Sequence, residues 1–220
     1  STGSTSDKVP MIQSGTSFEA SNKDEKEGDF HYEAKDKPTP EDLKVLGPFV
    51  TADTCKRYSY FSLKSYQLTK RDKEGTLKTY IFESNENYPI FLHDCGDFCK
   101  IYKPLEFNKQ YRFFYKGNKP KDYINGLDVL KEAYSRLMKD AELDDDSIPG
   151  SMKKKLPEAI FCSGERDALN AAGLGYYALW LNSETADLEW KDYIEISKMV
   201  DRIYNVPDID DTGIRMGKEL

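Results

Sequence analysis

The sequence predicts two units of different architecture: a smaller α+β unit with a mostly antiparallel sheet, followed by an α/β unit whose parallel sheet is flanked by helices. Short strand-like segments separated by turns run from residue 58 to residue 117, a series typical of an antiparallel sheet. From residue 158 onward, strand-like and helix-like segments alternate, which predicts a parallel sheet with helices on its faces. We therefore divide the chain into a disordered polar leader (1–40), the α+β unit (41–150) and the α/β unit (151–220).

The leader and the α+β unit differ in composition and in apolar periodicity. Residues 1–40 are rich in Ser, Thr, Gly, Lys and acids and show no apolar periodicity, which predicts disorder. "TPEDLKVLG" (39–47) predicts a short helix, with Thr39 as N-cap, Pro40 at its first position and Gly47 at its end. Five short segments rich in β-branched or aromatic residues then predict strands at 58–70, 77–84, 88–94, 99–105 and 110–117.

A predicted helix ends the α+β unit, and a linker follows it. "NGLDVLKEAYSRLMKDAEL" (125–143) places its apolar residues on one helical face. Residues 145–155 contain Pro149 and Gly150 and read as a linker. The α/β unit then offers strands at 158–164, 176–182 and 202–208, and helices at 165–175, 187–200 and 212–220. Functional residues collect at the carboxyl ends of the strands in such sheets.

The composition bounds the class of protein. The chain has 220 residues, of which 38% are hydrophobic and 13% aromatic, enough to bury a core. No apolar run approaches the roughly 18 residues that span a bilayer, so we expect no membrane partner. The four cysteines are sparse and irregularly spaced, which favours a reducing, cytoplasmic location over a disulfide framework.

The charge is unevenly distributed along the chain. The whole chain has a net charge of −7, yet residues 55–121 carry 14 basic and 7 acidic side chains. Within this basic block, lysines and arginines alternate with aromatic residues in the segment 100–116. Cations can meet phosphates while rings stack on bases, so we expect single-stranded nucleic acid as a partner. A solvated sheet face with its rings in the core is the alternative.

Acidic residues cluster where strands of the α/β unit end. Asp208 and Asp210 are two residues apart at the end of the third predicted strand, so both carboxylates can face one small volume. Magnesium is the natural occupant, because it takes hard oxygen ligands and keeps waters and substrate phosphates as the rest of its shell. Glu165 and Asp167 follow the first strand and could join the same cluster if strands one and three are neighbours.

These segments resemble a known family. In "IFCSGERDALNAAGLGYYALWLN…RIYNVPDIDDTGIRMGKEL" the motif residues resemble the Toprim domain of bacterial replicative primases and of twinkle-like and phage primase–helicases. Asp208, Asp210 and Gly213 match the family's Asp-x-Asp-x-x-Gly motif after the third strand. Five residues match the motif after the first strand: Gly164, Glu165, Asp167, Ala168 and Leu169. Residues 100–127 are similar to the basic, aromatic-rich segment that precedes the Toprim core.

The resemblance implies the catalytic region of a DNA primase, with template-directed nucleotidyl transfer as its reaction. Asp208 and Asp210 would hold Mg²⁺ (or Mn²⁺), with Glu165 as a third ligand or as a base and Asp211 as a supporting acid. Nucleoside triphosphates and a single-stranded DNA template would be the substrates. Four basic residues would contact template or nucleotide: Lys103, Arg112, Lys116 and Arg166. A fused or partner helicase is a further expected partner.

The sequence departs from the family pattern at two places. Ser163 occupies the position of the family's metal-proximal glutamate. Either Glu165 takes over that role, or the site binds metal without full polymerase activity. The sequence also stops within the third predicted helix, so we expect a fragment of a longer protein from a phage or mobile element. A Toprim-type nuclease and a non-catalytic DNA-binding relic are therefore kept as alternatives.

Other readings of the same residues carry less weight. The aspartates could simply cap the last helix, and "DIDDT" also matches the nucleophile motif of haloacid-dehalogenase-type phosphatases, which, however, opens that fold. His93, Cys95 and Cys99 form a loose cluster without the paired Cys-x(2–4)-Cys units that structural zinc sites prefer, so zinc is not expected. Cys162-Ser163 lacks the Gly-x-Ser-x-Gly frame of a nucleophile elbow.

Overall fold

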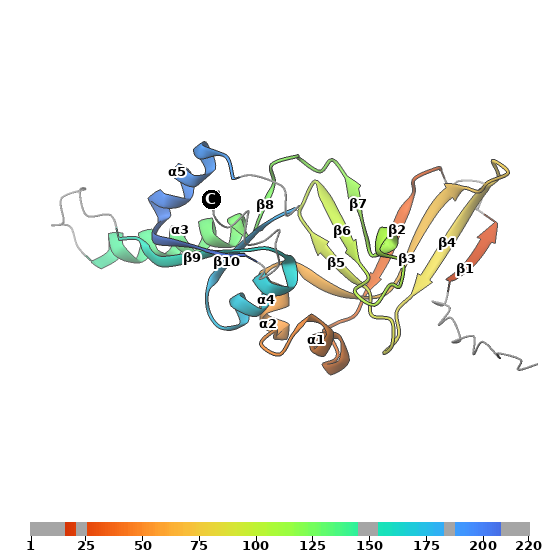
Figure 1. The fold of residues 1–220 in the computed structure, drawn as a ribbon, viewed down its shortest axis with the longest axis horizontal. Helices are drawn as coiled ribbons and strands as arrows, with labels where there is room; N and C mark the ends of the chain where they lie inside the picture. Colours follow the sequence, from red (N-terminus) through yellow and green to blue (C-terminus); the bar gives the residue numbers. More distant parts are fainter. Residues whose placement is uncertain (1–15, 21–25, 145–153, 183–187, 208–220) are drawn as a thin grey trace, which may run out of the picture.

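A computed structural model of the chain describes residues 16–20, 26–144, 154–182 and 188–207. Two sheets lie at opposite ends of an elongated molecule, with short helices between them (Figure 1). The first sheet has seven strands and is antiparallel throughout. The second has four strands and is mixed. In the described part of the chain, no helix has both the length and the apolar character that crossing a bilayer requires.

The seven-stranded sheet has the order β1-β4-β3-β5-β6-β7, and β2 pairs with β3 beside this path. Its longest strand is β3, which contributes Tyr60 to one core cluster and Leu63 and Tyr66 to another. The bounds are β1 Thr16–Ala20, β2 Phe30–Ala34, β3 Tyr60–Arg71, β4 Leu77–Glu83, β5 Phe91–Asp94, β6 Phe98–Tyr102 and β7 Phe113–Gly117.

The structure corrects the prediction of a disordered leader for two segments. β1 pairs with β4, and β2 pairs with β3, so both belong to the sheet. The ring of Phe30 on β2 lies 6.1 Å from that of Tyr66 and 6.2 Å from that of Phe114. The prediction was wrong here because these strands are stabilised by pairing with residues distant in sequence, which local composition does not report.

Two short helices connect β2 to β3: α1 (Pro40–Leu46) and α2 (Ala52–Arg57). The predicted start of α1 is confirmed, because the Asp42 N–H donates to the Thr39 hydroxyl and the Thr39 N–H donates to the Asp42 carboxylate. This reciprocal pair is a capping box. The helix ends at Gly47, whose φ of 143° lies in the region that favours glycine.

The mixed sheet has the order β11-β9-β10-β8. β9 (Leu156–Cys162), β10 (Tyr177–Leu181) and β11 (Val200–Val206) are parallel, as predicted, and β11 lies directly beside β9. The fourth strand, β8 (Ile124–Asn125), joins β10 in the antiparallel sense and makes the sheet mixed. It comes from the segment that the sequence analysis assigned to the first unit.

Helices cover both faces of this mixed sheet. α4 (Glu165–Gly173) shares a core with α1, α2 and alternate residues of β10, Ala178 and Trp180. α3 (Leu127–Asp144) and α5 (Trp190–Met199) share the other core with Leu179, which points to the opposite face. A short 3₁₀ helix (Lys109–Tyr111) precedes β7.

The two units are joined by buried polar contacts as well as by apolar packing. The N–H of Ala178 on β10 donates to the Tyr58 hydroxyl over 3.0 Å, and this bond is buried. The Arg57 guanidinium donates to the carbonyl of Ala172 at the end of α4. The Asn170 amide donates to the Leu46 carbonyl over 3.0 Å. The first core cluster therefore spans residues of both units.

The Tyr58 contact yields a stability prediction. Tyr58→Phe should lower the free energy of unfolding by about 1–3 kcal/mol, because it leaves the buried N–H of Ala178 without an acceptor. Chemical denaturation measures the change. Tyr32→Phe is the matched control, since the Tyr32 ring is exposed and loses the same atom. Equal stability of the Tyr58→Phe variant and the control would show that the bond contributes nothing.

Candidate functional site

The carboxyl ends of β9 and β11 meet at one edge of the mixed sheet. In the parallel register Val206 pairs with Cys162. The next residue after β9, Ser163, donates its hydroxyl to the Val206 carbonyl over 3.3 Å. The two strand ends that carry the sequence motifs therefore lie side by side. Asp208, Asp210, Asp211 and Gly213 lie outside the described residues, so their predicted separation stays a prediction.

Gly164 and Glu165 begin the helix that follows β9. Gly164 is the extended N-cap residue of α4, and Glu165 is the first residue of the helix. Glu165 is only 7% exposed, and one carboxylate oxygen, Oε1, accepts a hydrogen bond from Lys100 Nζ over 3.1 Å. The other oxygen, Oε2, is buried and has no hydrogen-bond partner among the described residues. Buried polar atoms are rarely left unpaired in native structures, which points to a bound group at this place.

Lys100 lies in the middle of β6, in the first unit, and its ammonium group is surrounded by aromatic rings. Nζ is 4.7 Å from the ring centroid of Phe113, 5.6 Å from that of Tyr102 and 5.8 Å from that of Tyr115. Ring faces attract cations at such distances. The Lys100 side chain is 14% exposed, so the ion pair with Glu165 is largely shielded from water. Burial raises the pKa of Glu165, while the charge and hydrogen bond of Lys100 act in the opposite direction.

The ion pair yields a pH-dependent prediction. Lys100→Met should lower the free energy of unfolding by about 3–5 kcal/mol near neutral pH, because it leaves the Glu165 carboxylate buried without a counter-charge. A carboxyl whose pKa is higher in the folded than in the unfolded state binds more protons when folded. Between the two pKa values stability therefore rises as pH falls. The destabilisation should shrink on going from about pH 8 to about pH 5.

Urea denaturation of wild type and variant at both pH values measures this effect. Lys64→Met is the matched control, because it removes an exposed partner of Glu33 and should change stability little at either pH. A loss for Lys100→Met that is the same at both pH values would mean that Glu165 is not the group responsible.

A cavity of about 460 Å³ lies beside the ion pair, between the two units. Three cations and one carboxylate line it: Lys100, Arg112, Arg166 and Glu165. The remaining lining residues are Tyr102, Phe113, Ser163, Gly164, Trp180, Leu181 and Asn182. The excess of positive charge and the rings suit an anionic ligand with an aromatic part.

Asn182, at the carboxyl end of β10, was not predicted from the sequence. Its Oδ1 accepts from Asn125 Nδ2 over 3.2 Å and from the Tyr115 hydroxyl over 3.4 Å. Asn125 Nδ2 also donates to the Trp180 carbonyl, which can only accept, so the NH₂ group of Asn125 must lie on this side of its amide. Asn182 must therefore turn its amide oxygen toward Asn125. Asn182 Nδ2 is then left as a buried donor without a partner among the described residues, as is Arg112 Nε. The position of Asn182 at the end of a predicted strand was the available signal.

The residues predicted to contact nucleic acid fall into two groups. Arg112 and Arg166 line the cavity. Lys103 does not: it is 6% exposed, its Nζ lies 3.8 Å from Glu106 and 5.4 Å from the Phe82 ring centroid, and burial lowers its pKa. Lys116 donates to the Gly28 carbonyl and also lies outside the cavity lining. An enclosed lysine such as Lys103 offers a phosphate little access, whereas Lys100, which the sequence did not distinguish from its neighbours, reaches the site.

Two other reactive side chains, Asp167 and Cys162, lie near this edge but do not line the cavity. Asp167 lies in the first turn of α4. Burial, with a smaller contribution from the Asp167 charge, raises the pKa of the Cys162 thiol to about 12. Such a thiol is a poor nucleophile at neutral pH.

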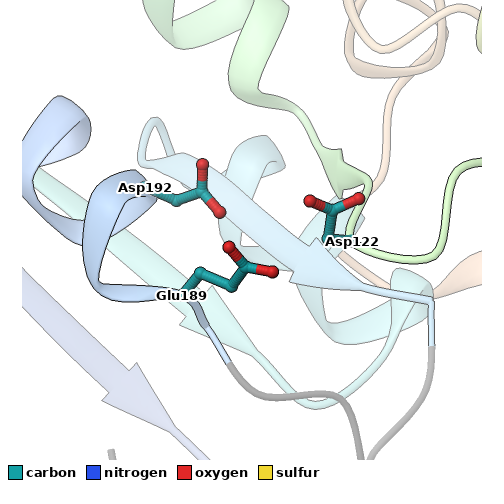
Figure 2. A group of neighbouring side chains, drawn as sticks. All are labelled: Asp122, Glu189 and Asp192. Atoms are coloured by element: carbon teal, nitrogen blue, oxygen red, sulfur yellow. The ribbon is translucent and has the colours of Figure 1, made fainter.

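Two further groups of potential metal ligands lie outside this cavity. Cys95 Sγ lies 3.6 Å from His93 Nδ1, and burial holds the His93 pKa at about 4 and raises the Cys95 pKa to about 12. Figure 2 shows the one group of three ligating side chains found close together in the described part of the chain: Asp122, Glu189 and Asp192, within 4.8 Å of one another. Lys191 Nζ already lies 3.3 Å from Asp122 and 2.8 Å from Glu189. This surface trio is thus partly neutralised from within the chain.

Comparisons with known proteins found neither a matching family model nor a matching curated protein. Solved structures that match include the E. coli primase catalytic core, at 9% identity over 80% of this chain and 57% of that chain, with a TM-score of 0.46. A DnaG primase catalytic domain bound to ssDNA matches at 9% identity over 85% of this chain and 60% of that chain, with a TM-score of 0.47. A DnaG catalytic core matches at 10% identity over 80% and 56%, with a TM-score of 0.42. This chain thus spans less than two thirds of those chains.

Proposed function

We propose that the chain is the catalytic region of a DNA primase, which joins nucleotides on a single-stranded DNA template. The observation that carries this proposal is the contact between the two motif-bearing strand ends, where Ser163 donates to the Val206 carbonyl beside a cation-lined cavity. The Asp-x-Asp motif begins two residues after Val206. We infer that Asp208, which follows Val206 by two residues, lies near the turn that presents Glu165.

The donor set fits magnesium or manganese. Asp208 and Asp210 are hard, anionic oxygen ligands of the kind that these ions prefer. The ion, held by Asp208 and Asp210, would neutralise the triphosphate and the charge that develops at the transferring phosphorus. Arg112 and Arg166 would hold phosphate oxygens, and Glu165 would orient the primer hydroxyl through Oε2. Ser163 would hold the end of β11 in place.

Exposed rings in β7 and in the segment before it support a single-stranded partner. Phe113 lines the cavity and is 45% exposed. Tyr111, which is 62% exposed, and Phe107, which is 99% exposed, precede it in the chain. Exposed rings next to cations allow stacking on bases of any sequence. Binding of a helicase, fused or separate, is a further part of this proposal and rests on the family resemblance alone.

A primer-synthesis assay tests the proposal. The chain is incubated with labelled ribonucleotides, Mg²⁺ or Mn²⁺, and unlabelled single-stranded DNA, and the products are separated on a denaturing gel. Short labelled oligomers are expected. Degradation of an end-labelled template would instead identify a nuclease. A mobility shift of the template without synthesis or cleavage would identify a non-catalytic DNA-binding protein. The presence of Ser163 at the position of the family's glutamate favours this alternative.

Binding to single-stranded DNA should weaken steeply with salt. The log–log slope should be about −0.7 for each phosphate neutralised. Arg112→Ala should make the slope less negative by about 0.7 if Arg112 contacts one phosphate. Fluorescence anisotropy with a labelled oligonucleotide measures both. Arg136→Ala, an exposed arginine on α3 paired with Glu132, is the control and should leave the slope unchanged. A slope near zero for wild type would exclude a phosphate-binding role for the cavity.

A further inference from the structure

The environment of Lys100 is that of a cation-binding site that the chain fills itself. A carboxylate oxygen lies 3.1 Å from the ammonium nitrogen, and three ring centroids lie within 5.8 Å of it. The lysine and the glutamate come from different units, Lys100 from β6 and Glu165 from α4. The pair is therefore fixed by the packing of the whole protein, and both side chains are mostly buried.

A divalent ion bound to Glu165 would have to share this space with the ammonium group. Two unit charges about 4 Å apart repel by about 4 kcal/mol at an effective dielectric constant of 20, and a divalent ion doubles this value. The hydrogen bond to Glu165 and the three nearby rings all favour this position of the ammonium group. Glu165 Oε2 has no hydrogen-bond partner among the described residues and can accept a hydrogen bond from a hydroxyl group, which requires no ion at this carboxylate.

From this geometry we propose that Lys100 is a built-in cation that occupies the place of a metal ion at Glu165 and so excludes a divalent ion from this carboxylate. The inference rests on the proposed function for the divalent ion at Asp208 and Asp210. It narrows the role of Glu165, which is then an acceptor paired with Lys100 and not a metal ligand. Lys100 has N–H donors beyond the one used by Glu165, and these can reach a phosphate oxygen in the cavity that it lines.

Titration with Mn²⁺, followed by the electron paramagnetic resonance signal of the free ion, tests this inference without an activity assay. Glu165→Gln should bind Mn²⁺ as wild type does, within about twofold, because the metal does not contact Glu165. Lys100→Met should bind Mn²⁺ about tenfold more tightly or bind an additional ion, because the freed carboxylate adds a hard anionic ligand. The double variant Lys100→Met/Glu165→Gln should lose this gain. Lys100→Arg keeps the charge and should resemble wild type.

Two results would overturn the inference: a roughly tenfold loss of Mn²⁺ affinity in Glu165→Gln, or no gain in Lys100→Met relative to the double variant. If Lys100→Met does not fold, Lys100→Gln replaces it in the Mn²⁺ titration. The glutamine removes the charge and keeps an N–H donor for Glu165. If neither lysine variant folds, the comparison of wild type with Glu165→Gln decides.

The proposed function fails separately. It fails if Asp208→Asn leaves Mn²⁺ binding unchanged, and the comparison of Lys100→Met with the double variant then still tests the role of Lys100.

Discussion

Asp210→Asn should reduce primer synthesis by about 10³-fold or more without unfolding the protein. Asparagine keeps the size of the side chain but removes the negative charge that a hard divalent ion requires. Metal stabilisation of transition-state charge is worth several kcal/mol, and each ~1.4 kcal/mol changes a rate tenfold. Single-turnover primer synthesis measures the loss, and the melting temperature and circular dichroism report the fold.

The control for this variant is Asp201→Asn. Asp201 is an exposed acid at the amino end of β11, opposite the end that the motif follows, and its loss should leave synthesis unchanged. Full activity of Asp210→Asn would remove Asp210 from the metal site. An equal loss in both variants would point to a general effect of charge on template binding.

Glu165→Gln should lower primer synthesis by about 10²-fold, whereas Ser163→Ala should stay within about threefold of wild type. The structure places the Glu165 carboxylate at the cavity, where it can accept a proton or a hydrogen bond, a role worth about 10²–10⁴-fold. The Ser163 hydroxyl is already occupied by the Val206 carbonyl. Loss of one neutral hydrogen bond costs about 1 kcal/mol, which should affect stability more than the reaction.

The same two variants separate the alternatives for the site. If activity survives Glu165→Gln and falls in Ser163→Ala, Glu165 has not taken over the role of the family's glutamate. If neither change matters although synthesis is observed, the reaction does not depend on the turn after β9. Combined with unchanged Mn²⁺ binding, the expected loss in Glu165→Gln would show that this carboxylate acts on a substrate proton and not through the metal.

Strong local patterns explain what the sequence predicted correctly. The alternating segments of the second unit each have their own period and their own end signals, so β9, α4, β10, α5 and β11 could be placed. The neighbouring position of strands one and three, left open by the sequence, is confirmed. The same pattern placed Glu165 after the first strand of this unit. In the structure Glu165 follows β9 and lines the cavity.

Features that depend on long-range packing could not be predicted in this way. Seven basic residues between 100 and 121 look alike in the sequence, yet only Lys100 and Arg112 of these line the cavity. Which one reaches Glu165 depends on the face of β6 that meets α4: Lys100 and Tyr102 point toward the cavity, while Ile101 between them is buried in a core cluster. Strands β1 and β2 were missed for the same reason, because their partners lie far along the chain.

The short strand β8 affects how the chain can be divided into fragments. β8 covers the β10 edge of the mixed sheet, and α3, which follows it, supplies Leu130 to the core beneath. A fragment that starts at residue 151 would lack both and would expose the N–H and carbonyl groups of β10 together with apolar surface. Uncovered edges of this kind pair with other chains. Expressed alone, the 151–220 fragment should therefore aggregate, whereas one that starts before Tyr58 retains the strand, the helix and the hydroxyl that caps Ala178.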